Sequence, residues 1–389
     1  MRARAERFGA IVRLAEPPAL VSIDRALARR AGIDGGALWS GDSPGLDVRA
    51  LTAPTEAHVS VTARCPAGCA GCYADARPDG HEPTLGELRA RLEALARSGV
   101  FSIAFGGGEA SLREDLPELG RIARSLGLVP TFTTSGLGIT PERARELAAF
   151  AQVNVSYDGA RDVYARARGW DGAALAERAI AVLRDAGIVV GVNTMLVRVT
   201  FEHVEETAAH AEALGVVELQ LLRYKPAGRG KLDYLATRLT PEQVERFPAL
   251  VRRLSDTRSL AVRIDCALVP FLASGGEVAA EWMRRFGVIG CEGGRSLLAT
   301  RSDGAALPCS FWGDAATSEA GDLDAAWAGD PTLERFRAHA ETPPEPCASC
   351  AFRAVCRGGC RVVARELAGT PWAPDPECPR VRAHKEIRS

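Results

Sequence analysis

Ten of the eleven cysteines in this 389-residue chain fall into two groups, and this distribution constrains the fold more than any other feature of the sequence. Three lie between Cys65 and Cys72, and seven lie between Cys291 and Cys378. A chain that is 47% hydrophobic can bury a large core and has little need of disulfides. Clustered cysteines therefore indicate metal ligands or catalytic thiols. The second group lies in a segment rich in glycine and proline with little periodicity, where we expect bound metal to supply cross-links.

Size and charge set broader limits. At roughly 150 residues per domain, the length indicates two or three domains. The 48 lysines and arginines against 49 aspartates and glutamates leave a net charge of −1, which gives no reason to expect nucleic acid or an anionic membrane as a partner. No apolar run approaches the ~18 residues of a membrane helix, and none follows the charged segment Met1–Arg7 as a secretory signal would require. We expect a cytoplasmic protein.

Between residues 58 and 228, short β-rich runs alternate with helical patterns, which is typical of parallel strands connected by helices. Six strands in this order predict an α/β fold, a partial (β/α)6 barrel with fewer strands than a closed TIM barrel, and functional residues at the C-terminal strand ends. The predicted strands are His58–Ala63, Phe101–Phe105, Val129–Thr134, Gln152–Tyr157, Val189–Val197 and Val216–Arg223. The predicted helices are Thr84–Ser98, Asp115–Leu126, Pro141–Phe150, Ala173–Ala186 and Phe201–Leu214.

The predicted barrel covers residues 56–230, and the rest of the chain lies before and after it in the sequence. An N-terminal extension, residues 1–55, is predicted to hold a hairpin and a short helix. A helical connector, residues 231–287, and a cysteine-rich C-terminal domain, residues 288–389, follow the barrel. The predicted elements outside the barrel are the hairpin strands Gly9–Leu14 and Ala19–Ile23 and the helices Asp24–Ala31, Pro241–Leu254 and Glu277–Phe286.

The first cysteine group has the spacing C-x3-C-x2-C, formed by Cys65, Cys69 and Cys72 directly after the first predicted barrel strand. The intervening residues are small, so the loop can wrap an inorganic core. Three thiolates suit a 4Fe–4S cluster that keeps one iron open. A structural zinc ion usually takes four ligands, and the nearest candidate for a fourth is His81.

This motif, followed by the aromatic Tyr73, resembles the signature of the radical S-adenosylmethionine (SAM) enzymes. The resemblance implies that the open iron chelates the amino and carboxylate groups of SAM. An electron from the cluster then cleaves the sulfonium and yields a 5′-deoxyadenosyl radical, which abstracts a hydrogen atom from the substrate.

Further positions match the family's SAM-binding elements in order along the chain. Glu109 resembles the glutamate of the Gly-Gly-Glu element that holds the SAM amino group, although the family's usual proline after it is Ala110 here. The alternatives are a glycine-rich turn, helix caps for the serines, a solvated charge for Arg168 and a core role for Leu222. The resemblance assigns SAM contacts to Tyr73, Gly107, Gly108, Glu109, Ser135, Ser156, Asp158, Arg168 and Leu222.

The second cysteine group resembles the seven-cysteine SPASM extension of radical SAM enzymes, because Cys291 and Cys309 flank Gly304 as C-x12-G-x4-C and the later spacings also agree. A paired zinc ribbon is the alternative. In the family, these cysteines hold two auxiliary 4Fe–4S clusters, which would make three clusters in all. The implied ligands are Cys347, Cys350, Cys356 and Cys378 for the outer cluster and Cys291, Cys309 and Cys360 for the inner one.

The inner cluster is thereby one cysteine ligand short. Some relatives carry an extra cysteine a few residues before the first, but the residues here are Val288–Gly290. The inner cluster could keep an open iron or take a non-cysteine ligand. Cys266 is the only spare cysteine, and we expect it to be a small buried residue instead.

A nearby cluster can accept the second electron of an oxidation, so the resemblance favours net oxidation and, as the leading hypothesis, a peptide maturase that forms crosslinks. A small redox protein such as flavodoxin or ferredoxin is the expected reductant. The 55-residue extension is too short for the whole winged-helix domain of many maturases, so leader recognition could be partial, absent or supplied by a separate leader-binding protein.

Three alternatives stay open. The enzyme could act on a small molecule, or the chain could be a non-catalytic iron–sulfur or zinc protein. Maturation of a sulfatase-like protein is disfavoured, because those relatives place an aspartate base where this chain has Ser310. Asp265 and Asp314 are candidate bases by residue type alone.

Overall fold

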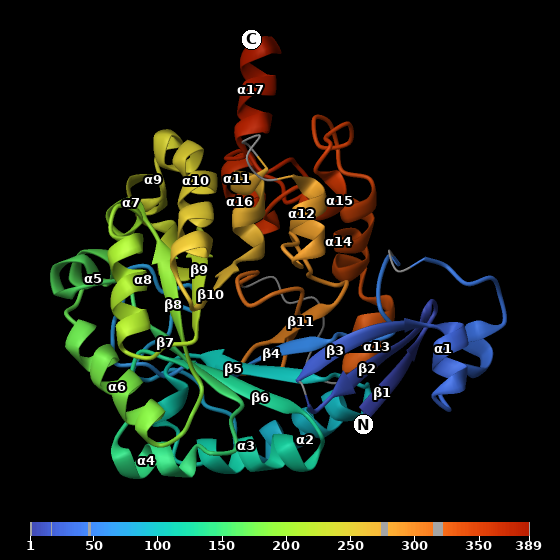
Figure 1. The fold of residues 1–389 in the computed structure, drawn as a ribbon, viewed down its shortest axis with the longest axis horizontal. Helices are drawn as coiled ribbons and strands as arrows, with labels where there is room; N and C mark the ends of the chain where they lie inside the picture. Colours follow the sequence, from blue (N-terminus) through green and yellow to red (C-terminus); the bar gives the residue numbers. More distant parts are fainter. Residues whose placement is uncertain (1, 17, 46–47, 274–278, 314–321, 389) are drawn as a thin grey trace.

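The computed structural model describes residues 2–16, 18–45, 48–273, 279–313 and 322–388, and a nine-stranded sheet runs through it (Figure 1). The strand order is β10-β9-β8-β7-β6-β5-β4-β11-β12, and every neighbouring pair is parallel except β11 and β12. All six predicted strands are present, which confirms the partial-barrel α/β fold. Their bounds are β4 Glu56–Thr62, β5 Ser102–Gly107, β6 Val129–Thr134, β7 Gln152–Ser156, β8 Val190–Leu196 and β9 Glu218–Arg223.

The predicted barrel helices are also present, and local capping explains where they begin. Thr84 and Glu87 form a capping box at the start of α2, and Thr140 caps α4. Helix α5 was not predicted, and its N-cap Ala160 offers no capping side chain. The helices are α2 Leu85–Arg97, α3 Leu116–Ser125, α4 Pro141–Glu146, α5 Arg161–Arg168, α6 Ala173–Asp185, α7 Arg198–Phe201, α8 Val204–Ala213, α9 Tyr234–Thr237 and α10 Pro241–Thr257.

Successive side chains of a strand point to opposite faces of the sheet, and apolar and polar residues alternate along these strands. One face is therefore apolar and the other polar. Val59 and Val155 belong to a large buried cluster that also contains Leu92 of α2 and Ile180 of α6. The opposite face carries polar side chains at the intervening positions, among them Ser156. The helices thus cover the apolar face, and the polar face is left to line the interior of the barrel.

Three further strands extend the sheet beyond the six predicted ones. β10 (Ala261–Ile264) pairs with β9, and β11 (Leu297–Thr300) pairs with β4 at the other edge, where β12 (Ala306–Leu307) follows. Each has two to four residues, too few for a period of two to stand out in the sequence. The cysteine-rich part of the chain is therefore attached to the barrel through the sheet itself.

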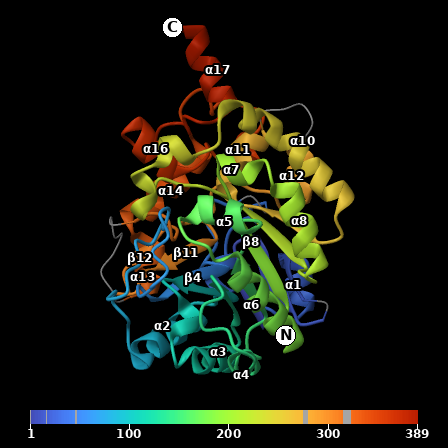
Figure 2. The ribbon, with the colours of Figure 1, turned by 90° about the vertical axis from the view of Figure 1, so that its left-hand side faces the viewer.

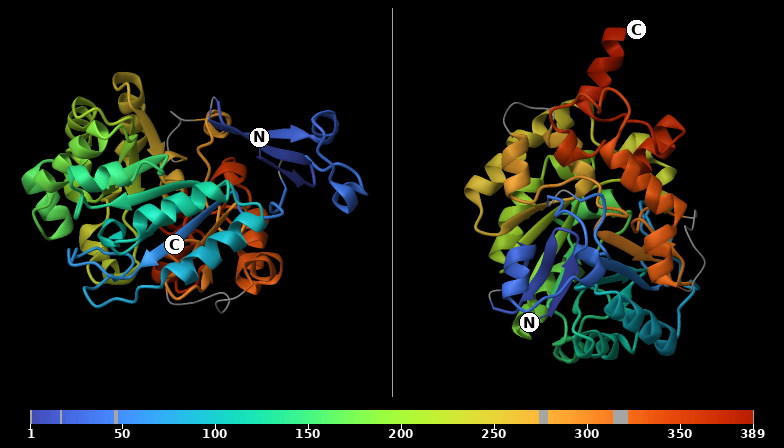
Figure 3. Two further views of the ribbon diagram at one scale, coloured as in Figure 1. Left: turned by 90° about the horizontal axis from the view of Figure 1, so that it is seen from below. Right: turned by 90° about the vertical axis from the view of Figure 1, so that its right-hand side faces the viewer.

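The N-terminal extension forms a separate antiparallel sheet in the order β1-β2-β3, followed by α1 (Figure 3). The predicted hairpin and helix are confirmed, and β1 adds a third strand. Arg2 and Arg4 of β1 donate to the carbonyls of Ala96 at 2.7 Å and Gly99 at 2.9 Å, which fastens this sheet to the end of α2. The bounds are β1 Arg2–Glu6, β2 Gly9–Leu14, β3 Ala19–Asp24 and α1 Arg25–Arg30.

The C-terminal region contains more helix than its weak periodicity predicts, and it lies above the β11 edge of the sheet (Figures 1 and 2). The predicted helix Glu277–Phe286 corresponds to α12, and its residues 277 and 278 lie outside the described residues. Within the described residues, no helix has the length and apolar character needed to cross a membrane. The helices are α11 Val269–Leu272, α12 Ala280–Arg285, α13 Leu323–Gly329, α14 Pro331–Glu341, α15 Arg353–Cys356, α16 Arg361–Ala368 and α17 Pro379–Arg388.

Candidate active site

The loop that carries the first three cysteines leaves the C-terminal end of β4 and is held on both sides. Backbone hydrogen bonds join Cys65 N to Arg77 O at 2.9 Å and Ala70 N to Arg168 O at 3.0 Å. Arg229 Nε donates to Cys69 O at 3.0 Å. The loop is therefore anchored to its own return segment, to α5 and to the segment after β9, as a preformed ligand loop requires.

The three thiols are all half-buried on this loop. Trp170 Nε1 donates to Cys69 Sγ at 3.1 Å, a contact that no motif in the sequence indicated. Burial raises the pKa of Cys65, so a thiolate there needs a cation such as iron to compensate the loss of hydration.

The glycine-rich segment after β5 packs directly against the base of this loop. Gly108 has no space for a side chain, because a Cβ would collide with the carbonyl of Arg64, and Glu109 N donates to that same carbonyl at 2.9 Å. The buried Glu109 carboxylate accepts from Ser135 N at 2.8 Å and from Ser111 Oγ at 2.7 Å. Two of the predicted SAM contacts, Glu109 and Ser135, are thus side by side at neighbouring strand ends.

Asp158 and Arg168 form a second pair of predicted residues. Arg168 Nε lies 2.6 Å from Asp158 Oδ2, and Asp158 Oδ1 accepts from Met195 N at 2.6 Å. Burial by itself would lower the pKa of Arg168, but Asp158 outweighs it and holds that pKa above its ordinary value. Because the carbonyl of Arg168 also binds Ala70, this fixed cation stands beside the cysteine loop.

The polar face of the barrel supplies the remaining predicted contacts. Ser156 lies beside Asn193 across the β7–β8 pair, and Leu222 lies beside Met195 across the β8–β9 pair. Asn193 is buried, and its Oδ1 has no hydrogen-bond partner among the described residues. Asn193 is not among the predicted contacts, although a lone amide in the apolar run Val189–Val197 is a usable signal. An unpartnered buried oxygen next to Ser156 fits a polar ligand such as a nucleoside.

Aromatic and cationic side chains connect the first cysteine group to the second. The rings of Tyr73 and Phe311 are 4.4 Å apart, and Lys225 Nζ lies 3.8 Å from the centre of the Phe311 ring. Burial raises the pKa of Tyr73 to about 12, so its hydroxyl stays protonated at neutral pH. Phe311 follows Cys309 closely in the sequence, so this contact brings the two cysteine groups to the same end of the barrel.

The three cysteines implied for the inner cluster, Cys291, Cys309 and Cys360, are called the inner set below. They all belong to one buried group of side chains. Cys360 is buried with Phe336 and Val363, and Cys291 and Cys309 pack against them. Burial and then the neighbouring Cys291 and Cys360 thiols raise the pKa of Cys309 to about 12. The three thiols implied for the inner cluster are therefore gathered, far apart as they are in sequence.

The four cysteines implied for the outer cluster, Cys347, Cys350, Cys356 and Cys378, lie around α15. Burial and then Cys378 raise the pKa of Cys347 to about 12, and burial, Cys378 and Cys347 raise that of Cys356. Cys350 N donates to Cys347 O at 3.2 Å in a tight turn. The thiols of Cys347 and Cys356 therefore lie near Cys378, and the turn brings Cys350 close to Cys347.

The donor chemistry of these sets fits iron–sulfur clusters. All eleven cysteines are free thiols, and thiolate sulfur is the usual ligand of such clusters. Within the part of the chain that the structure describes, no group of three or more His, Cys, Asp or Glu side chains meets in a site for a single metal ion. His81, the candidate fourth zinc ligand, is exposed.

The remaining candidates have different surroundings. Asp265 forms a buried ion pair with Lys225, which holds the pKa of Asp265 below its ordinary value although burial opposes this. Ser310 lies 3.0 Å from His58 Nδ1. Asp314 lies outside the described residues.

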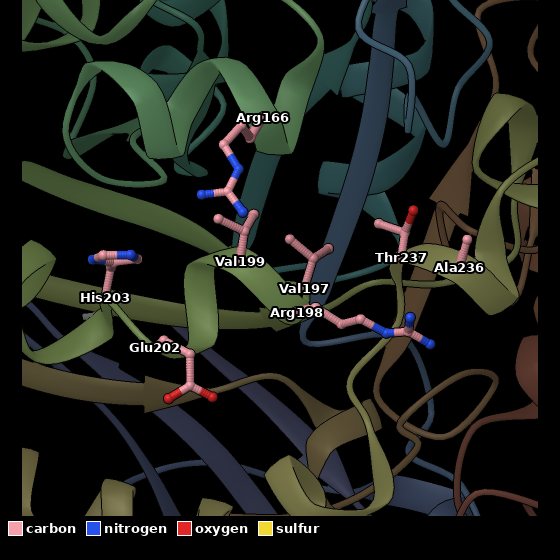
Figure 4. A pocket seen from close by; sticks show the side chains of 8 residues that line it. All are labelled: Arg166, Val197, Arg198, Val199, Glu202, His203, Ala236 and Thr237. Atoms are coloured by element: carbon pink, nitrogen blue, oxygen red, sulfur yellow. The ribbon is translucent and has the colours of Figure 1, made fainter.

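A cavity of about 360 Å³ opens beside β8, between α5, α7 and α9 (Figure 4). Arg166, Val197 and Thr237 are among the residues that line it, and none of the cysteines does. Arg198 at its rim donates to the carbonyls of Leu235 at 2.9 Å and Arg238 at 3.1 Å, so this cation serves the fold. The cavity is therefore separate from the cysteine-bearing loops.

Comparisons with known proteins agree with this geometry. The model of the radical SAM superfamily matches residues 59–211. The chain is 30% identical over 342 residues to a mycofactocin maturase MftC of Mycobacterium ulcerans, covering 84% of this chain and 88% of that protein. It is 30% identical over 369 residues to a PqqA peptide cyclase of Ruegeria pomeroyi, covering 89% and 92%. The structure of Streptococcus suis SuiB bound to precursor peptide SuiA has a TM-score of 0.75 at 17% identity, covering 97% of this chain and 98% of that chain, and shows the same fold.

Proposed function

Because the chain belongs to the radical SAM superfamily, we propose that it is a peptide maturase that cleaves SAM and oxidatively crosslinks a peptide side chain. The chain is an enzyme, and its family implies a 4Fe–4S cluster and bound SAM. The names of its relatives, a PqqA peptide cyclase and a mycofactocin maturase, support a peptide as the substrate. The observation that carries the proposal is the cysteine loop anchored directly beside Arg168 and Glu109.

We assign the first cluster to Cys65, Cys69 and Cys72. When bound, this cluster supplies the electron that cleaves the SAM sulfonium. Glu109, whose buried carboxylate is held by Ser111 and Ser135, complements the SAM ammonium group. The further SAM contacts proposed are Tyr73, Gly107, Gly108, Ser135, Ser156, Asp158, Arg168 and Leu222.

Arg168 has a more specific role in this proposal. Asp158 fixes one side of its guanidinium at 2.6 Å, which leaves the other donors to a carboxylate. A planar fork held in one orientation binds a carboxylate in one orientation, so Arg168 sets the position of the SAM amino-acid end.

We propose two auxiliary 4Fe–4S clusters in the C-terminal domain, one on Cys347, Cys350, Cys356 and Cys378 and one on the inner set. Abstraction of a hydrogen atom leaves a substrate radical, and net oxidation requires a second electron to leave it. The inner set lies next to Phe311 and Tyr73, on the side of the first cysteine loop. We therefore assign the inner cluster as the electron acceptor nearest the substrate.

Each predicted domain has its own role in this proposal. Residues 56–230 bind SAM and carry out radical formation, residues 231–287 connect, and residues 288–389 hold the auxiliary clusters. We also propose that the enzyme works in the cytoplasm. Its reductant would be a flavodoxin or a ferredoxin.

We assign recognition of the precursor peptide to the N-terminal sheet. β1 is fastened to the barrel by Arg2 and Arg4, whereas β3 is the other edge of the sheet. Leu20 and Val21 on β3 are 46% and 37% exposed. An unpaired edge with apolar side chains can accept an extended peptide as a fourth strand.

Anaerobic reconstitution of the full chain with iron, sulfide, SAM and candidate precursor peptides tests the proposal. We expect the peptide to lose the mass of two hydrogens, and we expect the Cys72→Ala variant to leave it unchanged. If peptides keep their mass while a small metabolite is oxidised, the assignment of a peptide substrate is wrong and the small-molecule alternative replaces it.

A further inference from the structure

The inner auxiliary cluster of the proposed function has three cysteine ligands, and a four-iron cluster has four iron corners to ligate. A free corner would allow the substrate to bind there. The identity of the fourth ligand therefore decides whether this cluster handles the substrate directly or only its electrons.

Cys266 lies in a turn whose backbone is fixed from several sides. It begins a short 3-10 helix, Cys266–Leu268, directly after β10. The preceding residue, Asp265, donates from its backbone N to Leu221 O at 3.0 Å and accepts from Arg223 N at 3.1 Å. The Asp265 carboxylate also forms a buried ion pair with Lys225. The end of β9 thus fixes the position of Cys266.

The same part of β9 reaches the inner set. Arg223 donates to Ala267 O at 2.8 Å and, from the same nitrogen, to Asp375 Oδ2 at 2.7 Å. Asp375 Oδ2 also accepts from Cys360 N at 3.0 Å. A continuous chain of buried hydrogen bonds therefore links the residue after Cys266 to the backbone of Cys360, and Ala267 and Cys360 share one buried cluster.

Charge interactions also indicate that the Cys266 thiol lies near the inner set. Burial is the main cause that raises the pKa of Cys266, followed by the Asp265 carboxylate, and the thiols of Cys291 and Cys360 add to it. The Cys266 thiol therefore lies near two thiols of the inner set and beside the Asp265–Lys225 ion pair.

The packing also argues against a space-filling role. Cys266 is half-buried and belongs to none of the apolar clusters formed by the described residues, whereas Cys291, Cys309 and Cys360 all belong to one. The residues on either side, Asp265 and Ala267, are held by hydrogen bonds, so the backbone of the turn is fixed on both sides of the thiol.

We propose that Cys266 is the fourth protein ligand of the inner auxiliary cluster, together with Cys291, Cys309 and Cys360. On ligation, the thiol loses its proton to solvent and the sulfur binds iron, with no change of oxidation state. With this ligand the inner cluster would have no open iron, so it would take up the electron of the substrate radical without binding the substrate.

The test uses a full-length background variant, Cys65→Ala with Cys69→Ala and Cys72→Ala, because the first cluster has an open iron of its own that would mask the result. After anaerobic reconstitution, about eight irons per chain should remain in two cubanes. A cubane with an open corner loses one iron on mild ferricyanide oxidation and becomes a paramagnetic three-iron cluster, which electron paramagnetic resonance and Mössbauer spectroscopy detect.

We expect the background variant to resist this oxidation and to keep its eight irons. Adding Cys266→Ala should produce the three-iron signal and the loss of about one iron per chain. Cys266→Val, which fills the space of the side chain and has no atom that can ligate iron, serves as the second variant if the alanine variant does not fold. Ala267→Ser is the matched control in the same turn and should behave as the background does.

Two other results would contradict the proposal, and each would overturn a different part of it. A background variant that already gives the three-iron signal, or a Cys266→Ala spectrum identical to it, overturns the role of Cys266 and leaves the proposed function intact. A background variant that binds no inner cluster overturns the three-cluster proposal and this inference with it.

Discussion

At the residue scale, the contact between Trp170 and Cys69 shows how a side chain outside any motif affects the site. The indole N–H donates to Cys69 Sγ at 3.1 Å from a position 101 residues away in sequence. Hydrogen bonds to ligating sulfur stabilise the reduced cluster and raise its reduction potential. In the proposed function, Trp170 is therefore a positioning and tuning residue for the first cluster.

Replacing Trp170 by Phe keeps an aromatic ring and removes the donor. We expect the potential of the first cluster to fall by some tens of millivolts, on the order of the effect of one hydrogen bond to sulfur. An anaerobic redox titration followed by electron paramagnetic resonance measures it, with Trp282→Phe, at a 39% exposed position on α12, as the control that leaves it unchanged. An unaltered potential in Trp170→Phe would show that the contact has no electronic role.

At the element scale, a buried ion network joins β9 to the C-terminal region. Arg223 lies 2.7 Å from Asp375 and 2.6 Å from Glu377, and all three side chains are less than a tenth exposed. Removing one partner from a buried network leaves charges that are neither paired nor hydrated. The network is thus a structural link between the barrel and the C-terminal region.

Arg223→Leu should lower the free energy of unfolding by about 3–5 kcal/mol, measured by denaturant titration at equal iron loading. The control is Arg246→Leu, because the Arg246–Glu202 pair is 58% and 45% exposed and should contribute about 1 kcal/mol or less. Equal losses in the two variants would contradict a special role for the buried network.

The sequence predicted the elements whose patterns are long or chemically explicit. Six strands with period-two alternation and capped helices such as the one after Thr84 were visible, and so were the cysteine spacings. The short strands β10 and β11 were not, because four residues carry too little periodicity. Trp170 was missed because its contact with Cys69 exists only after the chain folds. The surroundings of Cys266 could not be predicted from the sequence, because its neighbours come from distant segments of the chain.

At the scale of the whole molecule, the edge proposed to bind the precursor peptide is β3 of the N-terminal sheet. Leu20→Asp with Val21→Asp should weaken binding of the precursor peptide at least about tenfold, since burial of one aliphatic side chain contributes about 1.5–3 kcal/mol. Calorimetric titration measures the dissociation constant. Ile387→Asp, at an 84% exposed position on α17, is the control.

Formation of 5′-deoxyadenosine from SAM should be the same in the β3 variant as in the parent, because the cysteine loop is on another part of the chain. Unchanged peptide affinity in the β3 variant would assign leader recognition to a different surface or to a separate protein.

The most direct test of the account is the fate of SAM on the reduced, anaerobically reconstituted chain. We expect liquid chromatography and mass spectrometry to detect 5′-deoxyadenosine, and we expect replacement of Cys65, Cys69 and Cys72 by alanine to abolish it. A reconstituted chain that holds no iron at this loop, or an alanine variant that still turns over SAM, would contradict the account.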